Sequence, residues 1–319
     1  MPNETLTKRQ DRDETIPMQH KQSAQKRQRS RQGYWPFLVP AMIGVVALIA
    51  VPIGFTFYYS LRNYNLQIGS DQFNGVDNYI RLFTGQNGDF IAATLRTFGY
   101  VFVVIVFDFV LAMAQALLIF SMKQGWAKFW RAVFILPILV IPTASAVFWR
   151  NVMYAPHNGE FLKVLGLDGI VNPPLGDPKL AFWAIIVVVV WAWSPWVFIL
   201  FSSGLDQIDR SVIEASMVDG TSYFQRLRTI IFPLMRPVIF VTLSFKALDS
   251  FLSFPFVWVL TQGGPGDSTH ILSTFIYQQA FNLLDYGNGS AMAIVMLVIS
   301  GVISIAAVLG WQRFYGKEA

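Results

Sequence analysis

Charged residues inside apolar segments are the first candidates for chemistry in this chain. Lys246 and Asp249 lie within one long apolar run, and Asp108 lies in another. A separation of three positions places Lys246 and Asp249 on one helix face, where they can pair. A charge at the centre of a membrane helix costs roughly 2.5–3.5 kcal/mol on insertion scales, so these side chains must face protein or water. Two roles stay open: an ion pair that links helices, or the wall of a path for a polar solute.

Aromatic side chains accompany these charges. Trp193 precedes a Ser-Pro pair in an apolar run, and Phe254 and Trp258 follow Asp249 in the chain. Each ring offers a flat apolar face, and the indole adds one N–H donor. These rings therefore suit the wall of a solute path, although helix packing or a place in the aromatic belt of a membrane explains them as well.

Enzyme chemistry is not indicated. The chain has no Gly-x4-Gly-Lys-Ser/Thr phosphate loop, so we do not expect it to bind ATP itself. The three histidines, His20, His157 and His270, show no metal-ligand spacing, and there is no cysteine to serve as nucleophile or thiolate ligand. We expect no catalytic residue, no metal and no cofactor on this chain.

The elements that must position these residues are membrane-spanning helices. Of 319 residues, 54% are hydrophobic and only 13% are charged, a composition typical of a multi-spanning membrane protein. Six apolar runs are long enough to cross roughly 30 Å of hydrocarbon. We therefore predict an all-α, polytopic membrane protein with a six-span domain over residues 34–319. The spans are Phe37–Tyr59, Phe98–Phe120, Ala132–Phe148, Leu180–Phe201, Val238–Leu260 and Ala291–Leu309.

The distribution of Lys and Arg sets the expected orientation, because basic residues concentrate in cytoplasmic loops. With the N-terminus in the cytoplasm, the inner segments after the tail hold nine basic residues and the outer loops hold six. Both termini are therefore expected in the cytoplasm. The net charge of +5 arises largely from the inner segments, so it does not indicate a nucleic-acid partner. The outer six are Arg62, Arg81, Arg96, Arg150, Lys163 and Lys179.

Residues 1–33 are polar, of mixed charge, and end in the basic stretch KQSAQKRQRSRQ. We interpret them as a disordered cytoplasmic tail that helps to set the topology. Contact with anionic lipid headgroups is the alternative. A cleaved signal peptide is not indicated, because no small-residue cleavage pattern follows the apolar run.

A polar segment at about residues 205–235 predicts two short cytoplasmic helices. Ser211 with Glu214, and Ser222 with Gln225, each have the spacing of a capping box. Asp219-Gly220 is a turn signal between them. Pro233 is expected to end the second helix, because proline cannot continue the hydrogen-bond ladder.

The first of these helices is expected to meet another protein. Ala215 and Ser216 are small enough to let a partner surface approach closely, while Val212 and Met217 are apolar and need burial. Exposed apolar surface of this kind marks an interaction site. Glu214 either caps its helix or contacts the partner directly.

The same segment resembles a known signature. Glu214-Ala215-Ser216, then Gly220, then Ile230-Ile231-Phe232-Pro233 is similar to the Glu-Ala-Ala, Gly and Ile-x-Leu-Pro loop of permease subunits of binding-protein-dependent ABC importers. Nine residues separate Gly220 from Ile230, as in the family, whereas a serine and a phenylalanine replace an alanine and the leucine. The stretch LTQGGPGDSTHILSTFIYQQAF, residues 260–281, resembles the outer loop of the carbohydrate branch, the maltose and glycerol-phosphate type.

The resemblance implies a type I importer permease in the bacterial cytoplasmic (inner) membrane. The implied partners are a second, distinct but homologous permease, two ATPase subunits that carry ATP and Mg, and an extracytoplasmic solute-binding protein. The helix pair would dock on an ATPase subunit through Glu214, Ala215, Ser216, Asp219, Gly220, Ile230 and Pro233. The implied substrate is a carbohydrate, whether sugar, oligosaccharide, polyol or glycerol phosphate, and its path would involve Lys246, Asp249, Phe254, Trp258 and Trp193.

The alternative is a secondary transporter of a small polar solute, driven by an ion gradient. Such a protein is expected to contain an internal repeat with paired broken helices and ionisable coupling sites. The chain shows no convincing repeat, and Lys246, Asp249 and Asp108 are its only charges within the predicted spans that could couple to an ion. A copurifying ATPase would separate the two classes.

Overall fold

A computed structural model describes residues 35–85, 88–155, 160–166 and 173–315. The chain divides into two compact units, Met1–Thr56 and Phe57–Ala319. The predicted tail, residues 1–33, lies outside the described residues. The first unit contains most of α2 (Trp35–Ser60), which has Pro40 and Pro52 inside it. None of the most apolar stretch of α2 is buried within the chain, as expected for a helix whose surroundings are hydrocarbon or another protein.

The second unit contains three long, continuous spans that match the predicted runs and extend them. These are α4 (Gly88–Ser121), α8 (Pro178–Leu205) and α14 (Tyr286–Tyr315). Within the described ranges, five helices are long and apolar enough to cross a membrane, and one bent pair raises the number to six. The prediction of a six-span helical membrane protein is confirmed.

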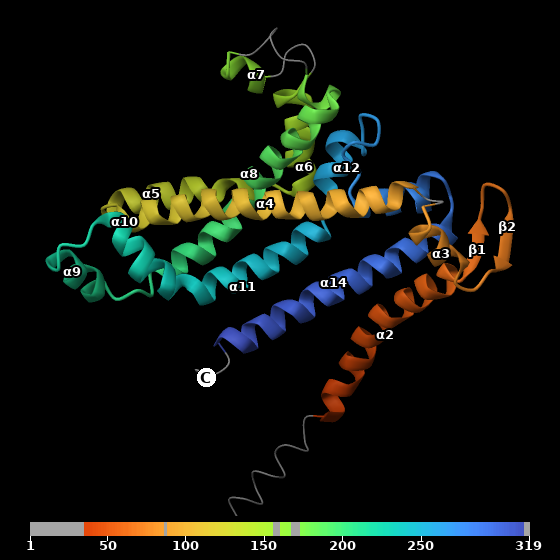
Figure 1. The fold of residues 1–319 in the computed structure, drawn as a ribbon, viewed down its shortest axis with the longest axis horizontal. Helices are drawn as coiled ribbons and strands as arrows, with labels where there is room; N and C mark the ends of the chain where they lie inside the picture. Colours follow the sequence, from red (N-terminus) through yellow and green to blue (C-terminus); the bar gives the residue numbers. More distant parts are fainter. Residues whose placement is uncertain (1–34, 86–87, 156–159, 167–172, 316–319) are drawn as a thin grey trace, which may run out of the picture. The chain divides into compact units, whose positions relative to one another are not determined.

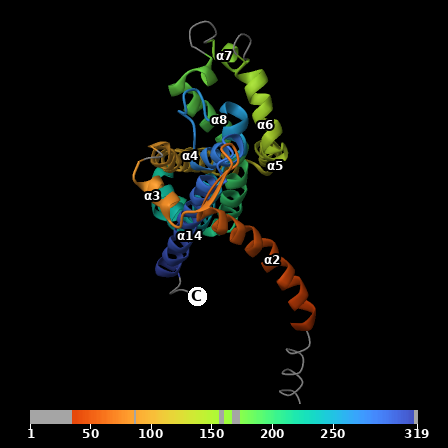
Figure 2. The ribbon, with the colours of Figure 1, turned by 90° about the vertical axis from the view of Figure 1, so that its right-hand side faces the viewer.

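The third span is sharply bent; its two prolines, Pro137 and Pro142, predict kinks from the sequence, and the break lies directly before Pro142. Its two halves meet at an angle of 92° and diverge clearly in Figures 1 and 2. A residue before proline avoids the helical region, and Ile141, before Pro142, has an extended ψ of 141°. The predicted run Ala132–Phe148 therefore crosses a break. The halves are α5 (Gln124–Ile135) with η1 (Leu136–Leu139), and α6 (Pro142–Phe148) with η2 (Trp149–Met153).

The fifth span starts and ends earlier than predicted. A continuous helix runs from Tyr223 to Phe251, so Pro233 does not end a short cytoplasmic helix. Pro233 lies in the first turn of α11, directly after a π-helical turn, and such local changes in hydrogen-bond register let a membrane helix accommodate proline. The predicted run Val238–Leu260 therefore covers two helices. The segments are α10 (Tyr223–Arg226), η4 (Leu227–Ile231), α11 (Phe232–Phe251) and, after the break, α12 (Pro255–Thr261).

Short elements connect the spans. A β-hairpin, absent from the all-α prediction, pairs β1 (Arg62–Asn65) with β2 (Ser70–Phe73) in antiparallel register. Asn65 also bridges to Asp285, just before α14. The remaining connectors are α3 (Asp77–Phe83), α7 (Glu160–Val164), η3 (Pro174–Gly176), α9 (Arg210–Val218), α13 (Leu272–Tyr277) and η5 (Gln278–Asn282).

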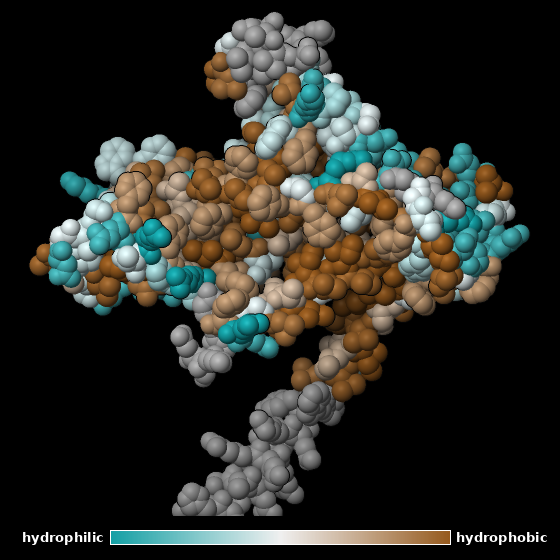
Figure 3. Space-filling view, in the orientation of Figure 1, coloured by the Kyte–Doolittle hydropathy of each residue, from teal (hydrophilic) through white to brown (hydrophobic). Residues whose placement is uncertain are grey.

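The core of the second unit forms around α8. Some 67% of the most apolar stretch of this helix is buried, against 33% for α4. A Cβ at Gly204 would lie 2.9 Å from the sulfur of Met235 and 3.1 Å from Cγ1 of Val238, so the glycine makes room for α11 against α8. In Figure 3 apolar side chains cover the middle of this unit, and polar side chains gather at the α9–α10 end and at the hairpin end. This band is the pattern that a membrane protein presents to lipid.

Candidate functional site

The first half of the predicted helix pair is present as α9, but its cap differs from the prediction. Asp209, not Ser211, is the N-cap residue, and its Oδ1 accepts a hydrogen bond from the Ser211 N–H at 2.9 Å. This backbone hydrogen bond lowers the pKa of Asp209. Glu214 lies more than a turn inside the helix, so the interpretation of Glu214 as a capping residue is wrong. Its side chain is exposed.

The turn after α9 is tightly held. Gly220 has a φ of +74°, a left-handed conformation that glycine adopts without steric cost. Thr221 Oγ1 donates a hydrogen bond to the Ser216 carbonyl at 2.7 Å, and Arg226 Nη1 donates to the Thr221 carbonyl at 2.9 Å. Ser222 caps the next helix as predicted. The turn therefore joins α9 firmly to α10 and to the long helix behind it.

The surface of this turn and helix is more apolar than the small residues alone suggested. Ser216 is only 5% exposed, and its Oγ donates to the Ile213 carbonyl, so the expectation that it faces a partner is wrong. Ala215 is exposed. Val218 and Phe224 are 88% and 81% exposed. We call the set Val212, Glu214, Ala215, Val218 and Phe224 the α9 surface.

The other predicted coupling residues follow a gradient of burial. Asp219 and Gly220 are exposed in the turn, whereas Ile230 and Pro233 are half-buried along the continuous helix. The seven residues therefore do not form one contact surface. Asp219 and Gly220 at the turn are open to another protein, whereas Ile230 and Pro233 lie along the helix that leads into the span.

The intramembrane charges form a cluster across two helices. Lys246 Nζ on α11 lies 3.3 Å from Asp249 Oδ2 and 3.4 Å from Asp108 Oδ2 on α4. The side chains of Lys246 and Asp108 are 1% and 0% exposed, whereas that of Asp249 is 48% exposed. The ring of Trp193 on α8 lies 5.1 Å from the ammonium, within the range of a cation–π interaction. The sequence predicted the Lys246–Asp249 pair but not the ion pair with Asp108.

The cluster has a buried side and an open side. Neither oxygen of Asp108 makes a hydrogen bond to a described residue, so charge attraction to Lys246 is what compensates its burial. Two carboxylates share one ammonium, and the carboxylate with open surface is Asp249. Asp249 is thus the member of the cluster that is free to accept hydrogen bonds from another molecule.

The predicted aromatic residues divide between two places. Trp193 belongs to the charge cluster, while Phe254 and Trp258 stack beyond the break after α11, with ring centroids 5.8 Å apart. Tyr277, which was not among the residues predicted from the sequence, joins them, with its ring centroid 4.5 Å from that of Trp258. No hydrogen bond, ion pair or ring contact between described residues joins this aromatic group to Lys246 or its partners.

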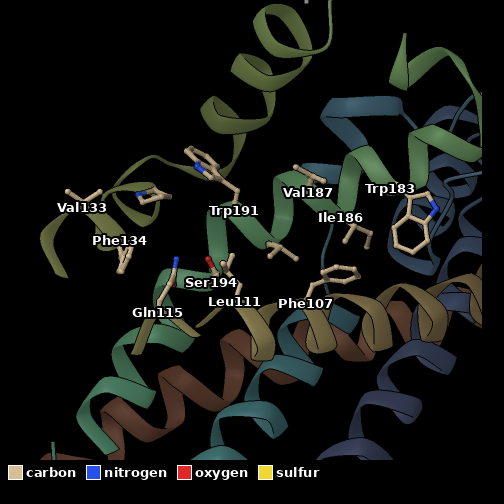
Figure 4. A pocket seen from close by; sticks show the side chains of 12 residues that line it. Phe107, Leu111, Gln115, Val133, Phe134, Trp183, Ile186, Val187, Trp191 and Ser194 are labelled. Atoms are coloured by element: carbon tan, nitrogen blue, oxygen red, sulfur yellow. The ribbon is translucent and has the colours of Figure 1, made fainter. Parts of the chain in front are cut away.

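A separate hollow is lined almost wholly by apolar side chains. It has a volume of about 470 Å³ and lies between α4, α5 with η1, and α8. Figure 4 shows Leu111, Phe134 and Trp191 around it, with Gln115 and Ser194 at one end. None of the five residues predicted to line the substrate path lines this hollow. Its apolar walls do not suit a polar solute.

Comparison with known proteins decides the class. Residues 124–314 match the family model of the binding-protein-dependent transport system inner membrane component. The chain belongs to this family of permeases. It is 33% identical over 276 residues to the trehalose/maltose transport system permease protein MalF of Thermococcus litoralis, covering 86% of this chain and 91% of that protein. The secondary-transporter alternative is not supported.

Solved structures share the fold of this permease. A chain of a bacterial ABC transporter involved in the import of the acidic polysaccharide alginate superposes with a TM-score of 0.76 at 21% identity, covering 92% of this chain and 99% of that one. A bacterial alginate ABC transporter in complex with an alginate pentasaccharide-bound periplasmic protein gives 0.75 at 21% identity, covering 90% and 96%. The permease is therefore a multi-pass inner-membrane protein of type I importer fold.

Proposed function

We propose that this permease is the transmembrane subunit of an ATP-driven importer that moves a carbohydrate into the cytoplasm. The names of its relatives refer to trehalose, maltose and alginate. Its partners would be a second homologous permease, two ATPase subunits that bind ATP and Mg, and an extracytoplasmic binding protein. Hydrolysis would take place on the ATPase subunits, and both termini of this chain would lie in the cytoplasm of a bacterial cell.

The observation that carries the proposal is the continuity between the α9 surface and the charge cluster. The helix that begins at Tyr223 also carries Lys246. At a rise of 1.5 Å per residue, the two residues are about 35 Å apart along the helix axis. A displacement of α9 is thereby transmitted along one helix into the membrane. To shift a two-state permease from 1:99 to 99:1 requires about 5.5 kcal/mol of differential binding, which a rigid connection transmits better than a flexible loop.

The α9 surface is suited to an ATPase cleft because it combines exposed apolar side chains with one carboxylate. Val218 and Phe224 supply the apolar contact. Glu214 supplies a charged side chain that does not cap the helix. Removal of apolar area from water favours association by roughly 25 cal/mol per Å². Of the seven coupling residues in the signature loop, those exposed at the turn would contact the ATPase subunit. Those along the continuous helix would stiffen the connection between the turn and the span.

The substrate path would use the open side of the charge cluster. Asp249 can accept hydrogen bonds from sugar hydroxyls while Lys246 fixes its position. Trp258 and Phe254 would offer ring faces to the apolar face of a sugar. Asp108 and Trp193 would act indirectly, because they hold Lys246 in place.

Reconstitution of the whole transporter tests the proposal. The permease is purified with the subunits that accompany it and placed in vesicles with the copurified binding protein and its labelled ligand. Uptake should require ATP, be blocked by vanadate and persist with a protonophore. If this chain alone takes up the ligand, and the protonophore blocks that uptake, the proposal of an ATP-driven importer is wrong.

A substitution at Phe224 tests the contact between the α9 surface and the ATPase subunits. Phe224→Ala should release the ATPase subunits during purification, because it removes a large exposed side chain from the proposed contact. Gln225→Ala, at the next exposed position, is the matched control and should retain them. Retention of the ATPase by both variants would place the contact elsewhere.

The substrate path is tested at Asp249. Asp249→Asn keeps the size of the side chain but weakens its acceptor, so we expect a several-fold rise in the KM for uptake with basal ATP hydrolysis unchanged. Ser244→Ala on the same helix is the control. An unchanged KM in Asp249→Asn would remove this residue from the path.

A further inference from the structure

The aromatic group beyond the break after α11 does not end at Tyr277. The ring centroids of Phe254 and Trp258 lie 5.1 and 4.5 Å from that of Tyr277, the last residue of α13. The Tyr277 ring in turn stacks on that of Phe281 in η5, with centroids 5.0 Å apart. Four rings thus follow one another from α12 to η5.

The succession of rings continues onto the hairpin. The Phe281 ring lies 6.3 Å from that of Tyr286 at the start of α14, and the Tyr286 ring lies 5.8 Å from that of Tyr64 on β1. The backbone holds this end in place, because the Leu66 N–H donates a hydrogen bond to the Leu284 carbonyl at 3.0 Å. We call the set Phe254, Trp258, Tyr277, Phe281, Tyr286 and Tyr64 the aromatic ladder.

The rings of the aromatic ladder are more open than those of a packed core. Phe281 is 58% exposed, and Trp258, Tyr277 and Tyr286 are only half-buried. Rings that served helix packing alone would be covered, as Phe256 beside them is at 2% exposure. Part of each open ring is therefore accessible to another molecule.

Free carboxamides flank the rings. Gln278 and Asn282 follow Tyr277 and Phe281 by one position each, so they lie beside these two rings on η5. The side chains of Gln278, Gln279 and Asn282 form no hydrogen bond with any residue in the described ranges. A carboxamide offers one acceptor oxygen and two N–H donors, and an aromatic ring offers a flat apolar face. A saccharide matches both, because its rings have apolar C–H faces and hydroxyl groups at their edges.

The segments that carry the aromatic ladder hold no cation that is free for an anionic ligand. Within residues 62–65, 254–258 and 277–288, only Arg62 and Asp285 are charged. Arg62 pairs with Asp71 at 2.7 Å. Asp285 accepts hydrogen bonds from the backbone N–H and the side-chain amide of Asn288, at 3.1 and 2.7 Å. Strong binding of a carboxylate or phosphate relies on charged donors, so the surroundings of the rings favour a neutral saccharide.

We propose that the aromatic ladder binds a neutral oligosaccharide. Successive sugar units lie on successive rings, and their hydroxyls form hydrogen bonds with the carboxamides of η5. The inference rests on the proposed function for the carbohydrate class, and it adds that the transported chain is uncharged and has several units. With the hairpin end outside, as the basic residues indicate, the ladder leads a sugar chain from the hairpin toward the break after α11.

Saturation-transfer NMR tests the proposal on the membrane-embedded assembly in nanodiscs, purified without its binding protein. Maltohexaose is the neutral probe, glucose is the single unit, and hexagalacturonate is an anionic chain of the same number of units. The wild type should bind maltohexaose more tightly than either of the others. Phe281→Ala should weaken maltohexaose binding about 3- to 10-fold, the range expected for loss of one aromatic contact. Phe281→Tyr keeps the ring and should retain binding.

Two further variants complete the test. Asn282→Ala should also weaken maltohexaose binding, and it should leave folding intact because this side chain forms no hydrogen bond within the described ranges. Leu283→Ala is the matched control, since it removes an exposed apolar side chain without a ring from the same connector, and it should bind as the wild type does.

Three results would overturn the proposal: glucose binding as tight as that of maltohexaose, hexagalacturonate binding as tight, or unchanged maltohexaose binding in Phe281→Ala or Asn282→Ala. ATP-driven uptake of the binding protein's ligand is measured on the same preparation. Uptake that persists without any maltohexaose binding contradicts the aromatic ladder alone. Maltohexaose binding without ATP-driven uptake contradicts the importer and leaves the ladder in place.

Discussion

Lys246 determines how charge is tolerated inside this permease. It offers one ammonium to two carboxylates from different helices and lies against an indole ring. A buried ion pair adds little net stability, yet loss of one partner leaves the other charge uncompensated. The residue is thus more important for the specific arrangement of α4, α8 and α11 than for total stability.

Removal of the ammonium should be strongly destabilising. In Lys246→Met the buried Asp108 loses its compensating charge, and we expect a loss of roughly 3–5 kcal/mol in the free energy of unfolding. Asp108→Asn/Lys246→Met removes both charges and should recover a large part of that loss. Thermal unfolding in detergent measures both. Equal stability of the single and double variants would contradict the ion-pair account.

His270 gives the loop between α12 and α13 a dependence on pH. Burial lowers its pKa, and the charge of Arg96 lowers it further, against a raising effect from Asp267. A histidine whose pKa is lowered on folding binds its proton more readily in the unfolded chain. The stability of the loop is therefore complete above the ordinary value of 6.5 and falls as the pH drops below it.

The measurement is the melting temperature between pH 7.5 and 5.5. We expect it to fall more steeply in the wild type than in His270→Gln, whose side chain does not titrate. Parallel slopes would show that other groups cause the dependence. Gly263 should stay unchanged in such work, since a Cβ there would lie 2.1 Å from the imidazole ring.

At the scale of elements, the proposed coupling device is one short helix, α9, joined to one long helix. The sequence predicted two short helices because Ser222 starts a helix and Pro233 is a breaker by itself. Ser222 does start one, but the π-helical turn η4 lets the helix continue past Pro233. The device is therefore stiffer than a pair of separate helices, because no loop lies between the turn and the span.

Substitutions at Gly220 test whether the turn transmits motion, because they act through the backbone conformation alone. No atom lies within 4 Å of a Cβ placed there, so only its φ of +74° opposes a substitution. Gly220→Val should strain the turn by roughly 1–2 kcal/mol and reduce substrate-stimulated ATP hydrolysis, whereas Gly220→Asn, which tolerates this conformation, should retain most of it. If Gly220→Val assembles and stimulates hydrolysis normally, the turn does not transmit the motion.

At the scale of the whole molecule, the second unit presents an apolar band between two polar ends (Figure 3). The distribution of basic residues places the α9 end in the cytoplasm and the hairpin end outside. This assignment of sides is an expectation from charge, and the fold is compatible with it because α9 and the hairpin lie at opposite ends of the unit (Figure 1).

The chain contains no cysteine, so single substitutions report topology cleanly. Gln225→Cys beside α9 should react with a membrane-impermeant maleimide only in inverted vesicles. Gln67→Cys in the turn of the hairpin should react only from outside intact cells. Both positions are exposed, and reaction of both from the same side would contradict the six-span topology.

Part of the candidate site was predictable because its signals are local. The turn at Gly220, the cap at Ser222 and the pair Lys246–Asp249 each depend on residues within a few positions of one another. The cap at Asp209 was missed because serine and aspartate compete for the same role two positions apart. The burial of Ser216 was missed because a small residue fits a contact surface and a packed helix face equally well.

The sequence by itself determined the number of apolar spans, the place of the polar segment and the family, since length, composition and motif spacing are properties of the chain. Only the tertiary structure decided that Asp108 is the second partner of Lys246, that the halves of the third span meet at 92° and that the fifth span runs through Pro233. These features depend on contacts between helices far apart in sequence, or on backbone hydrogen bonds that adapt around proline. The prolines mark where a helix can break, but the order of residues gives neither the bend angle, nor the continuation past Pro233, nor the distant partner of Lys246.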